Sequence, residues 1–513
     1  MRKIFFLAAL GLSVMAQAIE LDYYKTLVDE QADASKGTSP LYNLEYYADG
    51  SLLVLASYQT TTQDETGLLF NGQAYTGATA SRFSLTTTMN ALLAKLDANG
   101  NTLWAVPDTT YYFDLSGSAS ATTADGGAIF AQKMKNKKGR FMTYLNVHNN
   151  TSFVTHSTLL SSSYVRTESM TADPNDSYAW AGVVEDENGY VYLAGYQADT
   201  IFPTWHDTIP MRPNAWNGNS GTKSSNCNTV ILKFFKNNGD LQYVDATSYV
   251  AGLTYDRPLG LHYENGKLYL AGTYKVGTES GLYAACYNTD LTQDFIVSHQ
   301  ITGNLQFQQT KFEGGKILVC GGLAKNGSIT IGEKTVNASA TAANSGLIYV
   351  MDMLTGAAID AAVHVPESNP LNITVAAFPT ESGYVAYNHE TLNGIQVALN
   401  YDENMNLVSA DTIGLGGGSS TVSVVGRTAD GNKTAVGLRA RSNAPYYLLN
   451  EPSMQFTTTN WYSVIAVLNT ESQMSAVETI KTNSDKAVKF IENGQLIIMY
   501  NGTKYNVHGE IMK

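Results

Sequence analysis

A segment between residues 202 and 216 concentrates the side chains best suited to chemistry. Trp205, His206 and Asp207 are consecutive there, and Trp216 follows. A His beside an Asp can act as a general base or supply a metal ligand. An aromatic face beside polar groups suits a sugar ring, whose C–H groups pack on the aromatic ring, and it suits a protein partner equally well. We therefore predict a binding loop, with Trp205 as the platform and His206 and Asp207 as polar partners. In the alternative interpretation, Trp205 and Trp216 only cap the element beneath the loop.

Other reactive patterns are absent from the sequence. We find no nucleophile elbow, HExxH, Walker loop or complete EF-hand loop, and DANGN and DENGY lack the later calcium ligands. The cysteines, Cys227, Cys286 and Cys320, include no CxxC pair and leave at least one thiol unpaired. His389 and Glu390 are expected at the surface. We predict no catalytic residue, no metal and no cofactor, and we expect a protein that is not an enzyme.

The loop is embedded in a repeat. In five segments a turn glycine is followed six residues later by Gly or Ala, and these glycines are Gly50, Gly189, Gly266, Gly315 and Gly431. Weaker copies surround Gly126 and Gly383. Each unit has four strand-like segments joined by Asn-Gly or Asp-Gly turns, which are typical of hairpins. Each unit is too small to bury its own faces, so the units must stack on one another. The repeat therefore predicts an all-β, seven-bladed β-propeller of four-stranded antiparallel blades over residues 41–482. The small residue at the sixth position, such as Gly195 or Gly272, is predicted where strands crowd.

The third unit carries a family resemblance. DENGYVYLAGYQADTIFP, followed by NTVILKFFKNNGDLQY, resembles the seven-bladed β-propeller repeat of secreted bacterial proteins, although Tyr190 replaces the usual Asn. The resemblance spans roughly residues 41–480 and implies a fold rather than an activity. Residues 483–513 are predicted to form a short C-terminal β tail. It resembles the endings of exported Bacteroidales proteins, some of which serve type IX secretion; the alternative is a β-hairpin packed on the propeller.

The N-terminus predicts export. Arg2 and Lys3 precede an apolar run over residues 4–15 and the cleavage motif AQA, so residues 1–18 have the pattern of a signal peptide. We expect a periplasmic, outer-membrane-associated or extracellular protein, without a transmembrane helix because no later run of about 18 apolar residues exists. The net charge of −13 repels nucleic acid. Unit seven has four strand-like segments of its own, so residues 19–40, and Leu21–Val28 within them, are expected to add an extra outer strand or a clasp.

Long connections between second and third strands are predicted on one face of the ring, in the odd-numbered units. Besides the Trp205 loop, they carry the aromatic residues Phe70, Tyr75, Tyr446 and Tyr447. We predict that this face holds a glycan or protein partner, since loops on a rigid scaffold commonly bind. Alternatively, these aromatic side chains pack within their own loops and hold the loops against the blade. A polysaccharide-active hydrolase or lyase and a purely structural or adhesive envelope protein remain open as other functions. Lys95 and Lys233 are expected to be structural, with their charge at a blade edge.

Overall fold

The computed structural model is all-β in the part that it describes. That part comprises residues 20–29, 41–61, 66–76, 87–108, 112–135, 141–148, 155–162, 178–197, 228–237, 240–248, 255–276, 279–365, 372–390, 394–416, 421–440, 446–449, 455–456, 462–470, 487–492, 495–500 and 503–505. None of the described residues forms a helix able to cross a membrane.

Five four-stranded antiparallel sheets follow one another along the chain. The first three contain β2 (Leu41–Tyr46), β3 (Leu52–Thr61), β6 (Thr87–Leu96) and β7 (Thr102–Asp108); β8 (Tyr112–Thr122), β9 (Ala128–Lys135), β10 (Phe141–His148) and β11 (Thr155–Ser162); and β12 (Tyr178–Glu185), β13 (Tyr190–Gln197), β14 (Asn228–Asn237) and β15 (Asp240–Ser248). The other two contain β16 (Tyr255–Glu264), β17 (Lys267–Val276), β18 (Glu279–Asn288) and β19 (Gln293–Gln300); and β20 (Leu305–Glu313), β21 (Lys316–Ala324), β24 (Asn344–Asp352) and β25 (Ala358–His364).

Two six-stranded sheets contain segments from different units. One is ordered β26 (Asn372–Thr380), β27 (Gly383–Glu390), β28 (Ile395–Asp402), β29 (Leu407–Gly416), β32 (Tyr446–Leu448) and β33 (Gln455–Phe456). The other is ordered β30 (Thr421–Arg427), β31 (Lys433–Ala440), β34 (Tyr462–Asn469), β1 (Glu20–Asp29), β4 (Thr66–Phe70) and β5 (Gln73–Thr76). A small hairpin pairs β22 (Ser328–Ile331) with β23 (Lys334–Asn337).

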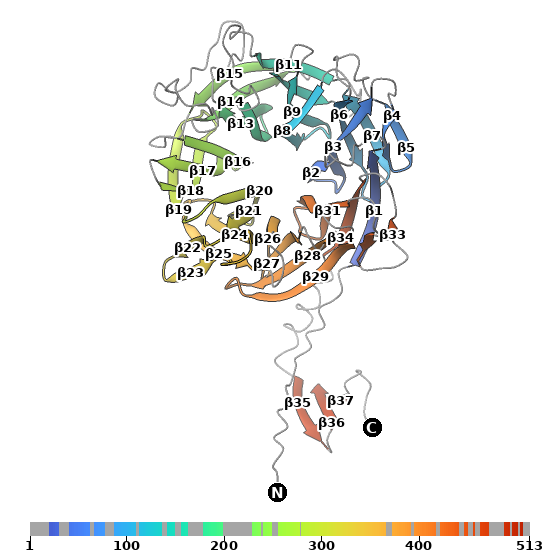
Figure 1. Ribbon diagram of the computed structural model, residues 1–513, viewed down its shortest axis with the longest axis vertical. Coiled ribbons are helices and arrows are strands. Elements are labelled where there is room, and N and C mark those ends of the chain that lie inside the picture. Colours follow the sequence, from blue (N-terminus) through green and yellow to red (C-terminus); the bar gives the residue numbers. More distant parts are fainter. Residues whose placement is uncertain are drawn as a thin grey trace. The chain divides into compact units, whose positions relative to one another are not determined.

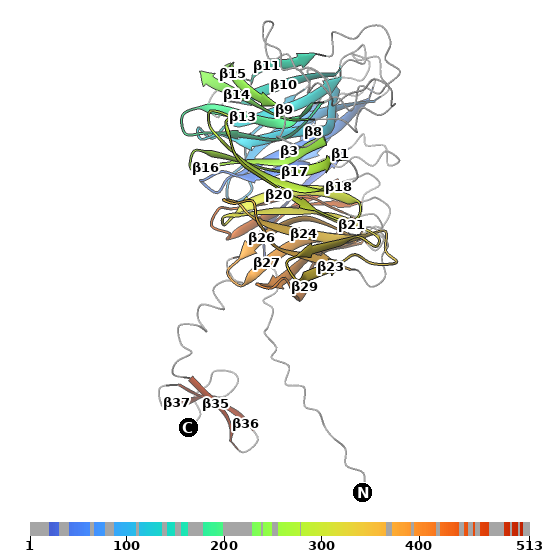
Figure 2. The ribbon, with the colours of Figure 1, turned by 90° about the vertical axis from the view of Figure 1, so that its left-hand side faces the viewer.

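The sheets of residues 21–468 are the blades of a β-propeller (Figure 1). The first strand of each sheet lies innermost and contacts the first strand of the next, in the order β2, β8, β12, β16, β20, β26, β30 and back to β2. The predicted all-β propeller of antiparallel, mostly four-stranded blades is confirmed. The edge view shows the sheets stacked side by side (Figure 2).

The core consists of side chains that interdigitate between neighbouring blades. Ile129 of β9 packs in one cluster with Val191 and Leu193 of β13 and Leu232 of β14. Because both faces of a blade are covered, central strands are buried almost continuously, as in β3 from Leu52 to Tyr58. The predicted turn glycines have the positive φ that a tight hairpin requires, for example +80° at Gly189.

The ring is closed by the N-terminal strand. In the last sheet, β1 lies between β34 and β4, so the fourth place belongs to residues from the opposite end of the sequence. The expectation that unit seven provides four strands of its own is therefore corrected; its predicted last strand, residues 474–480, lies outside the described residues. Between the open alternatives for Leu21–Val28, the structure gives a clasp. Such closure leaves no free edge between the first and last blades.

A separate unit contains the C-terminal residues. It holds a three-stranded antiparallel sheet of β35 (Ala487–Glu492), β36 (Gln495–Tyr500) and β37 (Thr503–Tyr505). The sequence predicts a β tail here, and the sheet has one short strand more than a hairpin.

Candidate ligand site in the axial channel

The innermost strands share an irregularity at equivalent places. The pairing of β2, β12, β16, β20, β26 and β30 with the second strand of each sheet skips one residue. The extra residue of a β-bulge leaves the ladder and its side chain is re-aimed. Three of these extra residues, Tyr42, Ala181 and Leu259, line a cavity at the centre of the ring.

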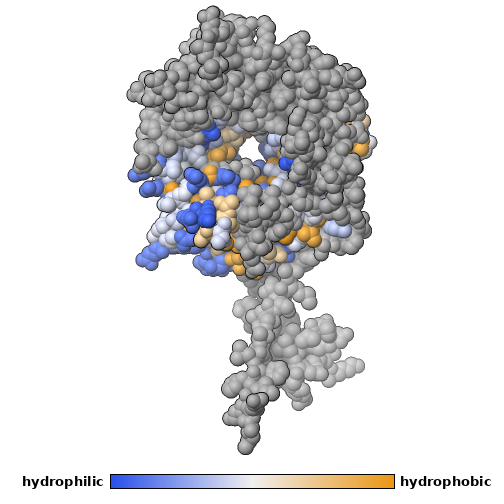
Figure 3. Space-filling view, viewed as in Figure 1, coloured by the Kyte–Doolittle hydropathy of each residue, from blue (hydrophilic) through white to orange (hydrophobic). Residues whose placement is uncertain are grey.

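The cavity lies among β2, β8, β12, β16 and β20 and has a volume of about 500 Å³. The space-filling view shows a hollow at the centre of the ring (Figure 3). This volume is within the range of roughly 300–1,000 Å³ that is typical of small-molecule sites.

Several polar atoms of the cavity lining have no hydrogen-bond partner among the described residues. They are Trp180 Nε1, Gln309 Oε1 and Thr310 Oγ1, and all three are buried. The exposed fraction of Trp180 is only 3%. Buried polar groups in folded proteins are almost always paired, and leaving one unpaired costs about 1–3 kcal/mol. The residues that line the cavity thus include one unpaired donor, one unpaired acceptor and one unpaired hydroxyl that can do either.

A carboxylate and an ammonium belong to the same lining. Glu45 Oε1 accepts hydrogen bonds from Thr122 Oγ1 at 3.1 Å and from the backbone N–H of Thr122 at 3.3 Å. Burial nevertheless raises the pKa of Glu45. Burial lowers the pKa of Lys311 to about 8, against the opposing effect of Glu45. The Lys311 ammonium lies 5.6 Å from the centre of the Phe378 ring.

His262 completes the polar lining on the β16 side. Its ring stacks on Phe312, with centroids 5.4 Å apart and planes inclined by 9°. Burial lowers the pKa of His262, so its imidazole is neutral at pH 7 and has both a donor and an acceptor nitrogen.

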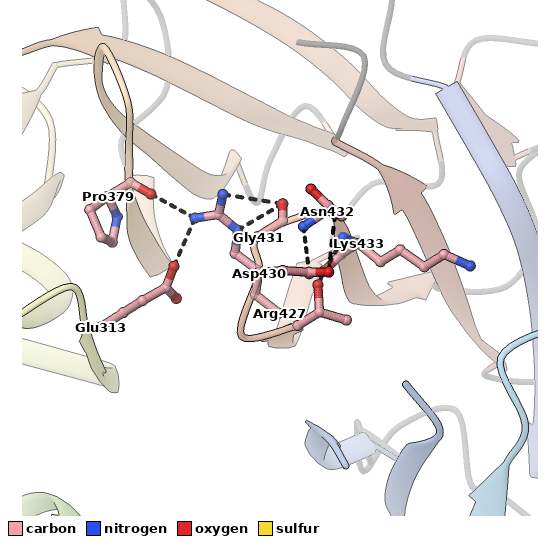
Figure 4. Close-up of polar contacts among 8 residues, drawn as sticks. Glu313, Pro379, Arg427, Asp430, Gly431, Asn432 and Lys433 are labelled. Atoms are coloured by element: carbon pink, nitrogen blue, oxygen red, sulfur yellow. Dashed lines mark hydrogen bonds and ion pairs between the residues drawn. The ribbon is translucent and has the colours of Figure 1, made fainter. Parts of the chain in front are cut away.

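One wall of the axial region is held by Arg427 of β30. Its Nη1 donates to Glu313 Oε1 at 3.1 Å and to the carbonyl oxygen of Pro379 at 2.7 Å (Figure 4). Its Nε and Nη2 both donate to the carbonyl oxygen of Gly431 at 3.3 Å. Since Glu313 ends β20, Pro379 lies in β26 and Gly431 precedes β31, this single guanidinium joins three neighbouring blades.

The predicted binding loop lies outside the described residues, and so Trp205, His206, Asp207 and Trp216 receive no position. The other residues predicted to bind the ligand do have positions. Phe70 and Tyr446 are fully buried, and the exposed fraction of Tyr75 is 9%.

The reason for this burial is that the connections form strands on blade edges. β4 and β5 extend the sheet closed by β1, and β32 and β33 extend the sheet of β26. Phe70 and Tyr75 pack in a core cluster, and Tyr446 Oη donates to Gln396 Oε1 at 2.5 Å. The prediction that these three rings bind a ligand is corrected, because they are buried and hold their own segments on the blade, as the alternative interpretation states. Tyr447, the next residue after Tyr446 in β32, is half-buried.

Two other expectations are revised. His389 is not on the surface, because its exposed fraction is 5% and burial lowers its pKa to about 4. Lys95 and Lys233 are structural, but their charges lie between blades rather than at an edge. Lys95 Nζ donates to the carbonyl oxygen of Gly126 at 3.2 Å, and Lys233 Nζ to that of Thr289 at 2.7 Å.

No metal cluster is found in the described part of the chain, where no three His, Cys, Asp or Glu side chains gather. Cys286 and Cys320 are buried free thiols there. The turns that resemble calcium loops are hairpin turns: Asp97 Oδ1 accepts from the backbone N–H of Asn99 and Asn101, at 2.9 and 2.8 Å.

Comparisons with known proteins find structures of similar fold. No family model matches the chain, and no curated protein does. Among solved structures, a polysaccharide lyase is 10% identical, with a TM-score of 0.42, over 88% of this chain and 100% of its own. The sialidase of Trypanosoma rangeli in complex with sialic acid is 10% identical, with a TM-score of 0.36, over 81% and 67% of the two chains. A dihydro-heme d1 dehydrogenase is 10% identical, with a TM-score of 0.35, over 86% and 78%. Similarity at this level concerns the fold alone.

The prediction that the protein is not an enzyme is wrong as an inference from this architecture. The structures of similar fold include a lyase, a sialidase and a dehydrogenase, so the fold gives no ground for excluding catalysis. The prediction considered the few carboxylates of the long connections, namely Asp64, Glu65, Asp207, Glu333 and Glu451. It overlooked the ionisable groups on the axis. A usable signal was present, because the ionisable residues Glu45 and Lys311 lie within first strands, where an all-apolar environment would not tolerate their charges.

Proposed function

We propose that this propeller binds a small polar ligand, the size of a mono- or disaccharide, in the axial cavity. The observation that carries the proposal is the set of unpaired buried atoms on Trp180, Gln309 and Thr310 around one cavity of about 500 Å³. A ligand that supplies an acceptor to the indole N–H and a donor to the amide oxygen would recover the free energy lost by their desolvation.

A hydroxyl-rich molecule matches this lining. Each sugar hydroxyl is both donor and acceptor, so neighbouring hydroxyls can serve Trp180 and Gln309 together. The apolar side chains of Leu259 and Phe312 also line the cavity and suit the C–H faces of a sugar ring. The proposal keeps the expected glycan class of ligand and adds a site on the axis to the one predicted in the Trp205 loop.

The test is calorimetric titration with a panel of mono- and disaccharides, sugar alcohols and sugar acids. Trp180→Phe removes the indole donor and keeps most of the ring. We expect it to weaken the best ligand about tenfold, the effect of one well-placed hydrogen bond. Trp104→Phe is the matched control, because Trp104 lies in the outer strand β7. If no panel member binds, or if both variants bind like the wild type, the proposal is refuted.

Three finer predictions also stand as proposals. We propose seven blades, counting each sheet of four or more strands as one, and a density map of the ring would test this count. We propose export through the signal peptide of residues 1–18, which N-terminal sequencing of the secreted protein would test.

We also propose that the loop of Trp205 binds a glycan or protein partner. Trp205→Ala should then lose the partner in a pull-down while keeping its melting temperature; a large melting loss contradicts this role.

A further inference from the structure

We propose that Lys311 is a nucleophilic amine, which forms an iminium bond with an aldehyde or ketone group of a ligand in the axial cavity. This inference rests on the proposed function and narrows the ligand class to carbonyl compounds, among them open-chain sugars.

The position of Lys311 separates it from an ordinary structural lysine. It is half-buried in the innermost strand β20, immediately after the unpaired Gln309 and Thr310, and it lines the cavity. Within the described part of the chain its Nζ has no hydrogen-bond acceptor. The aromatic ring of Phe378 lies near the Nζ atom but is not a base that could accept its proton. By contrast, Lys95 and Lys233 each donate to a carbonyl oxygen of the next blade.

The surroundings of Lys311 give it a larger fraction of free amine than an ordinary lysine has. Burial lowers its pKa to about 8, while Glu45 of β2, Glu313 of its own strand and the thiol of Cys320 in β21 act in the opposite direction. Two of these neighbours, Glu313 and Cys320, stabilise the Lys311 ammonium only weakly. Glu313 is paired with Arg427 of β30, and burial raises the pKa of Cys320, so the thiol is neutral. His262 of β16 is neutral at pH 7 as well.

The reaction needs no oxidant or reductant. The lone pair of Lys311 Nζ attacks the carbonyl carbon, and the carbon–oxygen π pair moves to oxygen. A proton passes from nitrogen to that oxygen and gives a carbinolamine. The hydroxyl then leaves as water with a proton from Glu45, whose pKa is raised by burial, and the C=N⁺ bond forms. The resulting Glu45 carboxylate shares the cavity with the iminium cation.

The experiment traps this bond in the full-length protein. Glyceraldehyde is added with sodium cyanoborohydride, and the modified lysines are located by peptide mass spectrometry. We expect labelling of Lys311 at pH 7 at least about tenfold faster than labelling of Lys267, an internal control paired with Asp294 at 2.9 Å. The Lys311 rate should rise with a midpoint near its pKa of about 8, whereas ordinary lysines continue to rise towards pH 10. Equal rates, or a midpoint near 10, would overturn the proposal.

Variants separate the parts of the inference. Lys311→Arg keeps the charge and should lose this label; if it does not fold, the pH profile of the wild type decides alone. Glu45→Gln should slow trapping about tenfold, and unchanged trapping would remove Glu45 from the reaction. Calorimetry with the sugar alcohols, which have no carbonyl, distinguishes two failures. Binding without trapping refutes the iminium alone, whereas neither binding nor trapping refutes the cavity as a ligand site.

Discussion

Replacement of Arg427 by Met is the most demanding test of how the ring is held together. The exposed fraction of the Arg427 side chain is 5%, and that of its partner Glu313 is 26%. Removing one partner of a buried pair costs about 3–5 kcal/mol, because the other charge stays desolvated. The carbonyl oxygen of Pro379, 2.7 Å from Nη1, also loses its donor. Since Glu313 retains some exposure, we expect the free energy of unfolding to fall by about 3 kcal/mol at pH 7.

The loss should depend on pH with a defined sign. Burial raises the pKa of Glu313, and Arg427 opposes that rise. Without Arg427 the pKa of Glu313 rises further, so the folded variant binds a proton that the unfolded chain releases. Stability of this origin is present below the unfolded pKa and is lost as pH rises through the folded pKa. The deficit of Arg427→Met should therefore be smaller at pH 5 than at pH 8.

Urea unfolding followed by tryptophan fluorescence measures both effects. Lys267→Met is the control, because its pair with Asp294 has exposed fractions of 34% and 50% and should contribute less than about 1 kcal/mol. Adding Glu313→Gln to Arg427→Met removes the orphan charge and should restore about 1 kcal/mol or more. A loss below about 1 kcal/mol for Arg427→Met, or no rescue in the double variant, would show that Arg427 does not hold the blades as described.

Further perturbations test other contacts. Gly272→Ala should destabilise by about 1–3 kcal/mol, because a Cβ there would lie 2.3 Å from a backbone oxygen, whereas Gly322→Ala, with a nearest contact of 3.4 Å, should be tolerated; equal melting temperatures would contradict the crowding argument. The pKa of His389 is lowered to about 4, so the wild type should lose up to about 3 kcal/mol as pH falls from 6.5 to 4, and urea titrations of His389→Leu should lack this loss. Lys233→Met should cost about 1.5–3 kcal/mol in the same assay, because the carbonyl oxygen of Thr289 loses a charged donor; an unchanged midpoint would mean that this bond contributes nothing.

The fold was largely predictable because its information is local. A turn glycine at φ near +80°, as at Gly189, and alternating strands on either side are visible within a dozen residues. The pairing of β1 with β34 was not predictable in the same way. It joins segments about 430 residues apart, and nothing in either segment specifies the other.

The candidate site was less predictable than the fold. Strict alternation assigns each residue of a first strand to one neighbouring blade or the other. The bulges at Tyr42, Ala181 and Leu259 interrupt that alternation and re-aim side chains, and no residue type marks them in the sequence. Sequence reasoning instead favoured the conspicuous aromatic residues of the insertions. Phe70 and Tyr446 show why this misleads, since an insertion that forms an edge strand needs large rings for its own packing.

The clasp strand has a consequence for the order of assembly during synthesis. β1 emerges first, yet its partner β34 is among the last strands to be made, so the edge of β1 would have to wait unpaired through most of translation. The register of Leu27 with Phe70 and of Asp29 with Leu68 gives β1 a second partner only about 40 residues away. Once β4 has been made, it can hold one side of β1 and bury Leu27 while the remaining blades form. The insertion of the first unit, which contains β4 and β5, therefore gives β1 a pairing partner until β34 has been made. Deleting this insertion should leave β1 as an exposed, aggregation-prone strand well before the ring can close.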